Sequence, residues 1–168
     1  IGPSADCIEK MGDKILSKKL AEEAGLPILK TIEVNSKPHA QLLKEVKELG
    51  YPVLIKASAG GGGRGMKCIS KEDELLSSIE KLKTEAKSSF KNDTLFIEKY
   101  IERPRHIEIQ ILADRFGNIV HLGERDCTIQ RRFQKIIEES PSPVLDDKLR
   151  QQMFDAAISL CKYVNYDS

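Results

Sequence analysis

The feature that most constrains the fold is a glycine-rich run between two apolar segments. Five of the six residues from 60 to 65 are glycine, with Val53–Ile55 before the run and Met66–Ile69 after it. Glycine lets backbone N–H groups turn toward an anion and approach it closely. Three of the glycines fit G-x-G-x-x-G, but a dinucleotide site needs a helix after the loop, and here a strand-like segment follows. We therefore expect a mobile β-hairpin that closes over phosphates.

Lys56 ends the apolar segment that leads into this loop. A lysine in that position is difficult to bury unless it meets an anion, which favours a phosphate partner. The Gly-Lys-Ser/Thr sequence of a Walker A loop is absent. A flexible glycine hairpin without any ligand is the alternative interpretation.

Apolar spacing around the loop predicts a compact α+β domain from residue 28 to about residue 100. A helix that starts at Pro3-Ser4 and stops at Gly25 precedes it. The domain itself should contain, in order, a strand, a helix, the hairpin, a second helix and a strand. The expected segments are Ile28–Val34, a helix capped by Ser36 and ended by Gly50, a helix opened by a capping box at Ser70–Asp73 with Leu75, Ile79, Leu82 and Ala86 on one face, and Thr94–Ile97.

A second unit is expected from Arg103-Pro104 onward. Arg105–Leu112 alternates strictly, which is typical of a strand with one apolar face and one polar face. Three antiparallel strands covered by one helix should result, which is a thin core. The remaining segments are a turn at Asp114–Asn118, strands at Ile119–Leu122 and Lys135–Glu139, and a helix marked by Leu149, Phe154, Ala157 and Leu160.

Three polar stretches are candidate binding residues. Ile97–Ile101 runs into the connection between the two units, where a planar base could lie, although such a stretch taken alone is more often plain interdomain packing. His106, Glu108 and Gln110 form one strand face, which suits either a nucleotide contact or an exposed outer face. Glu124–Lys135 mixes four cations with two carboxylates and fits a solvated charged loop. A single Phe gives RNA bases little to stack on, which disfavours an RNA-binding patch.

Composition narrows the classes further. The chain has 27 Lys and Arg against 26 Asp and Glu, so the basic excess of a general nucleic-acid binder is missing. The four cysteines lie far apart without a C-x-x-C pair, which disfavours zinc and indicates reduced thiols. No apolar run approaches the roughly 20 residues that span a bilayer. We therefore expect neither a nucleic acid nor a membrane as partner.

Four segments, in this order and spacing, resemble the ATP-binding region of biotin carboxylase, the ATP- and bicarbonate-using part of biotin-dependent carboxylases. They are Gly50–Met66, Ile97–Ile101, Pro104–Gln110 and Glu124–Glu139. The first segment alone would also fit carbamoyl phosphate synthetase, and the last narrows the resemblance to biotin carboxylase. The resemblance covers essentially all 168 residues and implies an ATP-grasp α+β fold. Its parts would be a linker helix region at 1–20, a lid subdomain at 21–101 and the truncated start of the C-terminal subdomain at 102–168.

The activity that this resemblance implies is that of a ligase. Bicarbonate would attack the γ-phosphate of MgATP, and the resulting carboxyphosphate would carboxylate protein-linked biotin, within an acyl-CoA or pyruvate carboxylase. The implied cofactors are ATP, Mg²⁺ with ligands beyond residue 168, and biotin on a carrier domain, so this segment alone should be inactive. Implied partners are a carboxyltransferase and further copies of the chain, in bacterial cytoplasm or mitochondrial matrix. The alternatives are another ATP-grasp carboxylate ligase, such as carbamoyl phosphate synthetase, and a non-catalytic nucleotide-binding module.

The resemblance also implies roles for individual residues, and it implies no metal ligand within this chain. Lys56 would contact the ATP phosphates, with Gly62 and Gly63 in the loop above them. Lys135 would be the catalytic residue that binds bicarbonate. The remaining nucleotide contacts would be Glu98, Lys99, Tyr100 and Ile101 at the adenine, His106 on the ribose and phosphate side, and Gln130 in the same cleft. Two positions depart from the family pattern: Ser4 replaces a Lys of some relatives, and Phe133 replaces a His of many.

Overall fold

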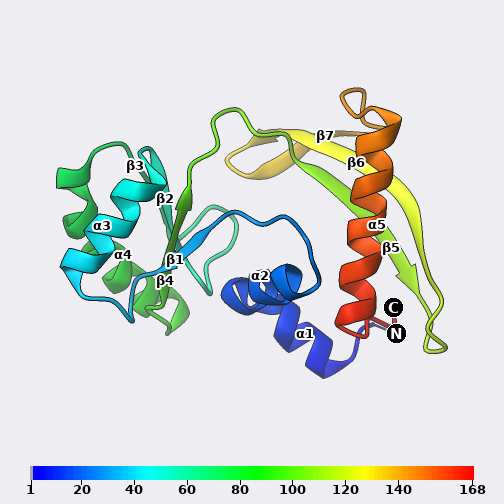
Figure 1. The fold of residues 1–168 in the computed structure, drawn as a ribbon, viewed down its shortest axis with the longest axis horizontal. Helices are drawn as coiled ribbons and strands as arrows, with labels where there is room; N and C mark the ends of the chain where they lie inside the picture. The colour runs from blue at the N-terminus through cyan, green and yellow to red at the C-terminus, as the bar shows by residue number, and fades with distance from the viewer. Residues whose placement is uncertain (1) are drawn as a thin grey trace. The chain divides into compact units, whose positions relative to one another are not determined.

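The computed structural model describes residues 2–168, which form two compact units (Figure 1). Residues 29–102 form the glycine-loop unit, and residues 2–28 with 103–168 form the charged-sheet unit. Each unit combines helices with an antiparallel sheet, so the expected α+β class is confirmed. The predicted subdomain limits of 1–20, 21–101 and 102–168 remain predictions, but residues 21–28 pack with the charged-sheet unit. No helix within residues 2–168 is both long and apolar enough to cross a membrane.

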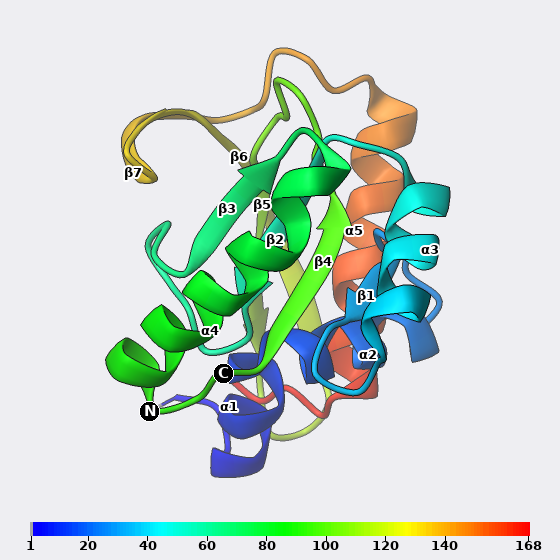
Figure 2. The same cartoon turned by 90° about the vertical axis from the view of Figure 1, so that its left-hand side faces the viewer.

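The glycine-loop unit is a four-stranded antiparallel sheet in the order β1-β4-β2-β3. Helices α3 and α4 lie over the same face of this sheet (Figure 2). The elements are β1 (Thr31–Glu33), α3 (His39–Leu49), β2 (Val53–Ala57), β3 (Met66–Ile69), the 3-10 turn η1 (Glu72–Glu74), α4 (Leu75–Phe90) and β4 (Leu95–Lys99).

Fourteen buried apolar side chains fill the space between this sheet and its helices. Burial of each large aliphatic side chain stabilises the fold by about 1.5–3 kcal/mol relative to exposure. The face predicted for α4 is confirmed, since Leu75, Ile79, Leu82 and Ala86 are all buried. The sheet therefore holds the base of the glycine loop on a dry, well-packed support.

The charged-sheet unit is a three-stranded antiparallel sheet in the order β5-β6-β7, with α5 packed against β5 and β6. The ring of His121 on β6 stacks on Phe154 of α5, with centroids 3.8 Å apart. Helix α2 joins α5 through hydrogen bonds from Ser159 to Ala24 and from Tyr163 to Glu23. The elements are α1 (Ala5–Gly12), α2 (Lys14–Glu23), β5 (Ile107–Ala113), β6 (Ile119–Arg131), β7 (Gln134–Glu139) and α5 (Asp147–Tyr163).

Three helix starts differ from the predictions. The single helix expected up to Gly25 is interrupted at Asp13, whose carboxylate accepts from the backbone N–H groups of Ile15 and Leu16 and so begins α2. Ser36 caps nothing, because Pro38 precedes α3 without a side-chain cap. The capping box predicted at residues 70–73 is wrong as well, since η1 occupies its place.

Strand β6 is much longer than the predicted Ile119–Leu122. The stretch Glu124–Lys135 was expected as a charged loop, but its first eight residues continue the strand to Arg131. Arg132 and Phe133 both have positive φ values, 50° and 66°, between β6 and β7. Positive φ at both central residues is the geometry of a tight two-residue hairpin turn. Phe133, 59% exposed, therefore lies at the tip of a hairpin.

Candidate functional site

The glycine run is the connection of the β2–β3 hairpin, as predicted. Its base is closed by the Ala57 N–H, which donates to the Gly65 carbonyl at 2.7 Å. A Cβ at Gly60 would lie 2.8 Å from the Arg64 carbonyl oxygen, and one at Gly65 would lie 3.0 Å from the Ala57 Cβ. Gly65 also has φ +68°, which L side chains rarely adopt. These two glycines are therefore required by the fold of the hairpin itself.

The tip of the loop has a different character. Gly62 and Gly63 have φ values of 59° and 78°, and no Cβ contact restricts Gly61 or Gly62. Within residues 2–168 the backbone N–H groups of residues 61–63 show no hydrogen bond. Consecutive free N–H groups in such a turn form a concave anion-binding surface. The tip is thus chemically suited to phosphate oxygens.

Lys56 and Glu98, both predicted site residues, form an ion pair across β2 and β4. The Glu98 side chain is only 5% exposed and the Lys56 side chain is 29% exposed. The sequence predicted that a lysine at this position meets an anion, and in the structure that anion is a carboxylate. Glu98 therefore holds the Lys56 ammonium at the end of the strand that leads into the loop.

Lys99 uses its ammonium within its own unit. Its Nζ donates to the carbonyl oxygens of Gly50 at 2.9 Å and Tyr51 at 3.0 Å, and the Tyr100 N–H donates to the Pro52 carbonyl at 3.2 Å. Tyr100 and Ile101 are 36% and 45% exposed. The end of β4 is therefore anchored to the turn before β2, and the adenine roles of these residues remain predictions.

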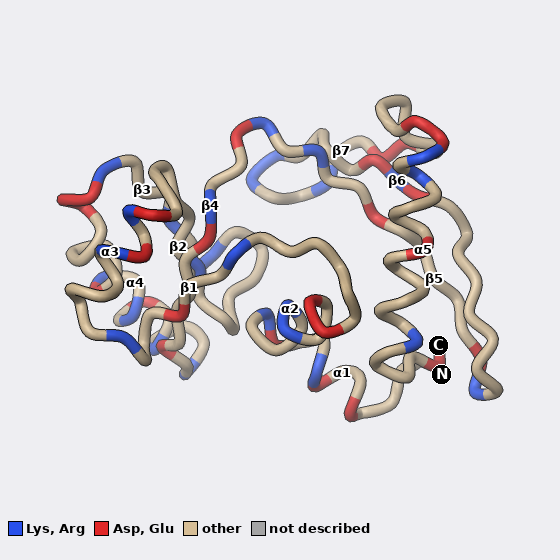
Figure 3. The backbone as a smooth tube through the Cα atoms, viewed as in Figure 1, with Lys and Arg blue, Asp and Glu red and all other residues tan. Residues whose placement is uncertain are grey.

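Glu108 is the centre of an ionic network on the charged sheet. It pairs with Lys135 of β7, with Arg125 of β6 at 3.2 Å and with the His106 ring at 3.0 Å. The hydrogen bond from Lys135, helped by Arg125 and His106, lowers the pKa of Glu108 to about 2. The same contact raises the pKa of Lys135. Figure 3 shows both charge signs along the β6–β7 hairpin. Glu108 is thus an anion and Lys135 a cation at neutral pH.

Cys127 and Glu138 extend this network. The Cys127 thiol is buried, its Sγ lies 3.6 Å from a Glu138 carboxylate oxygen, and Arg125 reaches the same carboxylate at 3.5 Å. Burial, with Glu108 and Glu138 nearby, raises the pKa of the thiol. A protonated thiol is a poor nucleophile, so Cys127 is not suited to nucleophilic catalysis.

Sequence analysis missed a second group, on residues that bridge β6 and the segment before α5. Glu124 is buried, accepts from the Ser142 N–H at 3.1 Å and pairs with Arg150 at 2.8 Å. Asp126 is buried as well and accepts from the hydroxyl groups of Thr128 and Ser142. The pKa of Glu124 is lowered chiefly by Arg150, and that of Asp126 chiefly by Thr128. These contacts fix the strand that carries Arg125, Cys127 and Gln130.

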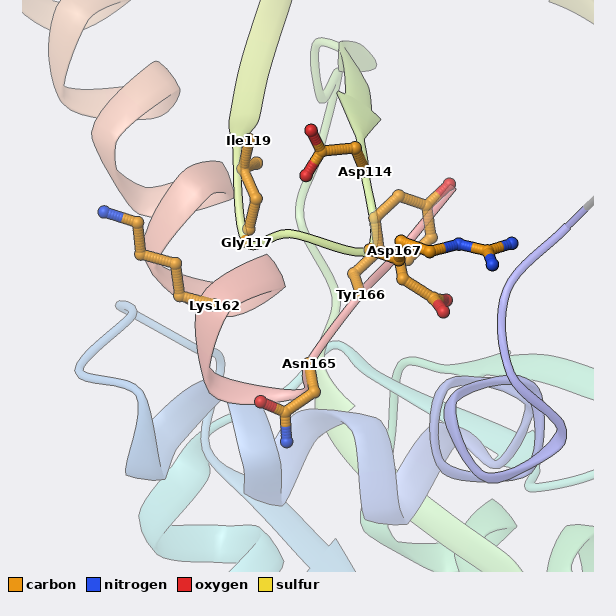
Figure 4. Close-up of a pocket in the computed structure, with 8 residues that line it drawn as sticks. Asp114, Gly117, Ile119, Lys162, Asn165, Tyr166 and Asp167 are labelled. Atoms are coloured by element: carbon orange, nitrogen blue, oxygen red, sulfur yellow. The ribbon is translucent and has the colours of Figure 1, made fainter.

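A pocket of about 340 Å³ in the charged-sheet unit contains none of the predicted site residues. It lies between the β5–β6 turn and the end of α5 (Figure 4). Its lining combines two acids with two bases: Asp114, Arg115, Gly117, Ile119, Lys162, Asn165, Tyr166 and Asp167. No chemistry in the pocket distinguishes one class of ligand from another.

Comparison with known proteins gives one family and several similar chains. Residues 13–168 match the family described as carbamoyl-phosphate synthase L chain, ATP binding domain. The chain is 49% identical to biotin carboxylase 1 of Bacillus subtilis, covering 99% of this chain and 37% of that protein. It is 48% identical to the methylcrotonoyl-CoA carboxylase alpha subunit, mitochondrial, of Dictyostelium discoideum, covering 99% and 24%. The chain therefore spans only about a quarter to a third of the length of these relatives.

A solved structure gives the same result for the fold. The biotin carboxylase domain dimer of Hydrogenobacter thermophilus 2-oxoglutarate carboxylase, crystallised with MgADP, ADP and bicarbonate, superposes with a TM-score of 0.92 at 44% identity. The match covers 99% of this chain and 37% of that one. The expected ATP-grasp fold is thereby confirmed.

Proposed function

We propose a function from one premise: the chain belongs to the family of the carbamoyl-phosphate synthase L chain, ATP binding domain. The proposed activity is ATP-dependent carboxylation of protein-linked biotin with bicarbonate through carboxyphosphate, as part of a biotin-dependent carboxylase. The observation that carries this proposal is the network in which Glu108 holds Lys135 as a cation on an open sheet. The names of the similar relatives support the biotin-dependent reaction over that of carbamoyl phosphate synthetase.

The nucleotide contacts are assigned to the glycine-loop unit. Backbone N–H groups at the tip of the loop donate hydrogen bonds to phosphate oxygens, and Lys56 supplies positive charge next to them. A charge-assisted hydrogen bond of this kind contributes about 1.5–3 kcal/mol. Glu98 keeps the ammonium in place before a nucleotide arrives. Preorganised charge of this sort stabilises a transferring phosphoryl group without reorganisation during the reaction.

Bicarbonate is assigned to Lys135. Its ammonium has three donors, and Glu108 occupies one, so an anion can accept from another. Arg125 fixes the position of Glu108. Glu108 in turn keeps the Lys135 side chain from turning out into solvent. A positioned anion next to a phosphoryl group lowers the barrier mainly by proximity and orientation.

Magnesium does not fit the residues in this chain. Within residues 2–168 the one cluster of possible ligands is Glu108, Cys127 and Glu138. A thiol is a soft ligand that suits Mg²⁺ poorly, and both carboxylates already pair with cations. We therefore derive no step through Mg²⁺ from these residues, and we propose that ligands outside this sequence hold the ion.

The test uses two variants in the enzyme that carries this chain, with ATP and bicarbonate varied separately. Lys56→Ala should weaken nucleotide binding about tenfold to a hundredfold, the equivalent of one lost charge-assisted contact. Lys135→Gln should leave nucleotide affinity nearly intact and impair bicarbonate-dependent turnover. Lys148→Gln, an exposed lysine on α5, is the matched control. A Lys135→Gln defect confined to the Michaelis constant for ATP would sink the bicarbonate assignment.

Two further measurements separate the rivals. Free biotin should stimulate bicarbonate-dependent ATP hydrolysis, whereas a carbamoyl phosphate synthetase would show no response to biotin. Nucleotide binding without any turnover would identify a non-catalytic module instead. Further proposed partners are a biotinylated carrier, a carboxyltransferase and a second copy of the chain, in bacterial cytoplasm or mitochondrial matrix.

A further inference from the structure

The ring of His106 is hydrogen-bonded at both nitrogens. Nδ1 lies 3.0 Å from the side-chain nitrogen of Gln130, and Nε2 lies 3.0 Å from a carboxylate oxygen of Glu108. The backbone of His106 is held as well: its N–H donates to the Thr128 hydroxyl at 3.0 Å, and its carbonyl accepts from the Cys127 N–H at 2.8 Å. The ring therefore has a fixed place between two side chains of different chemistry.

The orientation of the Gln130 amide follows from a third partner. Its side-chain nitrogen also lies 2.8 Å from the Cys127 carbonyl oxygen, which can only accept a hydrogen bond. The amide must therefore present its NH₂ group and not its oxygen at this point. One hydrogen of that group goes to the carbonyl and the other points at His106. Nδ1 must then be an acceptor and carry no proton.

Glu108 leads to the same conclusion from the other side of the ring. Its pKa is held at about 2, so the carboxylate is ionised at neutral pH and only accepts. Nε2 must then carry a proton. A carboxylate alone would favour the doubly protonated ring, and an NH₂ group at Nδ1 opposes that second proton. The other charged groups on this carboxylate are Lys135 and Arg125.

We propose that Gln130 is a positioning residue that keeps His106 neutral, with its proton on Nε2. This inference rests on the proposed function, in which Lys135 binds bicarbonate. An imidazolium at position 106 would compete with Lys135 for the single negative charge of Glu108. By excluding it, Gln130 leaves that charge to the lysine and keeps Lys135 in the place where it meets the anion. Gln130 thus acts on bicarbonate through three intermediate side chains, those of His106, Glu108 and Lys135.

The test is nitrogen NMR of the His106 ring, at neutral pH, in the enzyme that carries this chain. The unmodified chain should show one protonated nitrogen, Nε2, and one bare nitrogen, Nδ1. Gln130→Glu places an acceptor at Nδ1, and two carboxylates around one ring should leave both nitrogens protonated. Gln130→Met removes the group that opposes the second proton without adding charge, so the doubly protonated ring should be more populated than in the unmodified chain.

Gln110→Glu is the matched control, because Gln110 lies on β5 and contacts Arg125 instead of His106. It adds the same charge to the same sheet and should leave the ring spectrum unchanged. A ring that is already doubly protonated in the unmodified chain, or one that stays neutral in Gln130→Glu, would overturn the inference. The spectra involve no substrate, so the inference can fail while bicarbonate-dependent turnover persists. The expected spectra together with an absence of that turnover would contradict the proposed function alone.

Discussion

The two units of this chain stabilise their sheets in opposite ways. The glycine-loop unit contains every member of the cluster of fourteen buried apolar residues. In the charged-sheet unit the buried side chains include Glu124, Asp126 and Ser142, and strand β7 is exposed along its whole length. The first sheet thus rests on a large apolar cluster, whereas ion pairs and charge-assisted hydrogen bonds take a larger share in the support of the second.

This difference matches the work that we assign to each unit. Apolar packing is non-directional and tolerates a mobile hairpin at its edge, because the support does not depend on the position of the loop. Charge-assisted contacts are directional and fix individual side chains in place. A phosphate loop needs the first kind of support, and a small anion that must be oriented needs the second.

The largest expected effect comes from the same Ile→Ala truncation on one edge strand of each sheet. Ile69→Ala on β3 removes a fully buried side chain and should lower the free energy of unfolding by about 2–5 kcal/mol. Ile137→Ala on β7 truncates a side chain that is 52% exposed and should cost less than about 1 kcal/mol. Urea unfolding, with amide hydrogen exchange to assign each loss to its unit, measures both. Equal costs would remove the contrast between the units.

Within the charged-sheet unit, the loss of the cation that pairs with a buried carboxylate should cost more stability than the loss of an exposed carboxylate. Arg150→Met leaves the Glu124 side chain, which is 2% exposed, without its cation and should cost about 1–3 kcal/mol. Asp147→Ala removes the solvent-exposed partner of the same arginine and should cost about 0.5 kcal/mol or less. The same unfolding measurements apply. A cost for Arg150→Met no greater than that of Asp147→Ala would show that Glu124 needs no cation.

A smaller effect separates the base of the glycine loop from its tip. Gly65→Ala places a Cβ at φ +68° and 3.0 Å from Ala57, and should cost about 1–2 kcal/mol. Gly61→Ala has open space and should change stability by about 0.5 kcal/mol or less. Thermal unfolding of the two variants, measured under the same conditions, compares the two losses of stability. If Gly61→Ala were the more costly change, the base would not be the constrained part.

The last comparison is the pH dependence that Glu108 gives to the charged-sheet unit. The pKa of Glu108 falls from 4.5 to about 2 on folding, so the folded state binds its proton less readily than the unfolded state. Its stabilising contribution is complete above pH 4.5 and declines as the pH falls toward 2. Glu108→Gln should show a weaker decline than the unmodified chain when hydrogen exchange of β5 and β6 is followed across that range, because Glu124 and Asp126 still contribute. A variant that declined as steeply as the unmodified chain would show that other carboxylates cause it.

The sequence predicted those parts of the fold that depend on regular patterns of apolar residues. The hairpin of β2 and β3, the buried face of α4 and the three-stranded sheet under α5 all follow from periodicity, since burial selects residue type at fixed intervals. Helix starts were predicted less well. Ser36 and Ser70 have the right side chains for capping, but α3 begins after Pro38 and η1 after Lys71, and neither start has a side-chain cap.

The charged part of the site was harder to predict, because ion pairs join residues far apart in sequence. Lys56 and Glu98 are 42 positions apart, and no spacing rule connects them. Strand β6 was cut short in the prediction because Glu124, Arg125 and Asp126 resemble a loop by composition. In the structure these residues alternate between the two faces of a strand, where each charge has a partner. Composition indicates the presence of such partners but not their identity.

The four thiols of this chain differ in accessibility, so a dye can be attached selectively to the glycine hairpin. Cys7 and Cys127 are buried, Cys161 is partly covered, and burial raises the pKa of all three. Cys68 is exposed on β3, in the stem of the hairpin. Because alkylating reagents need an accessible thiolate, a maleimide dye should attach there first. The closure over a nucleotide that we expect of this loop can thus be tested by fluorescence in the unmodified sequence, without the cysteine replacements that such labelling usually demands.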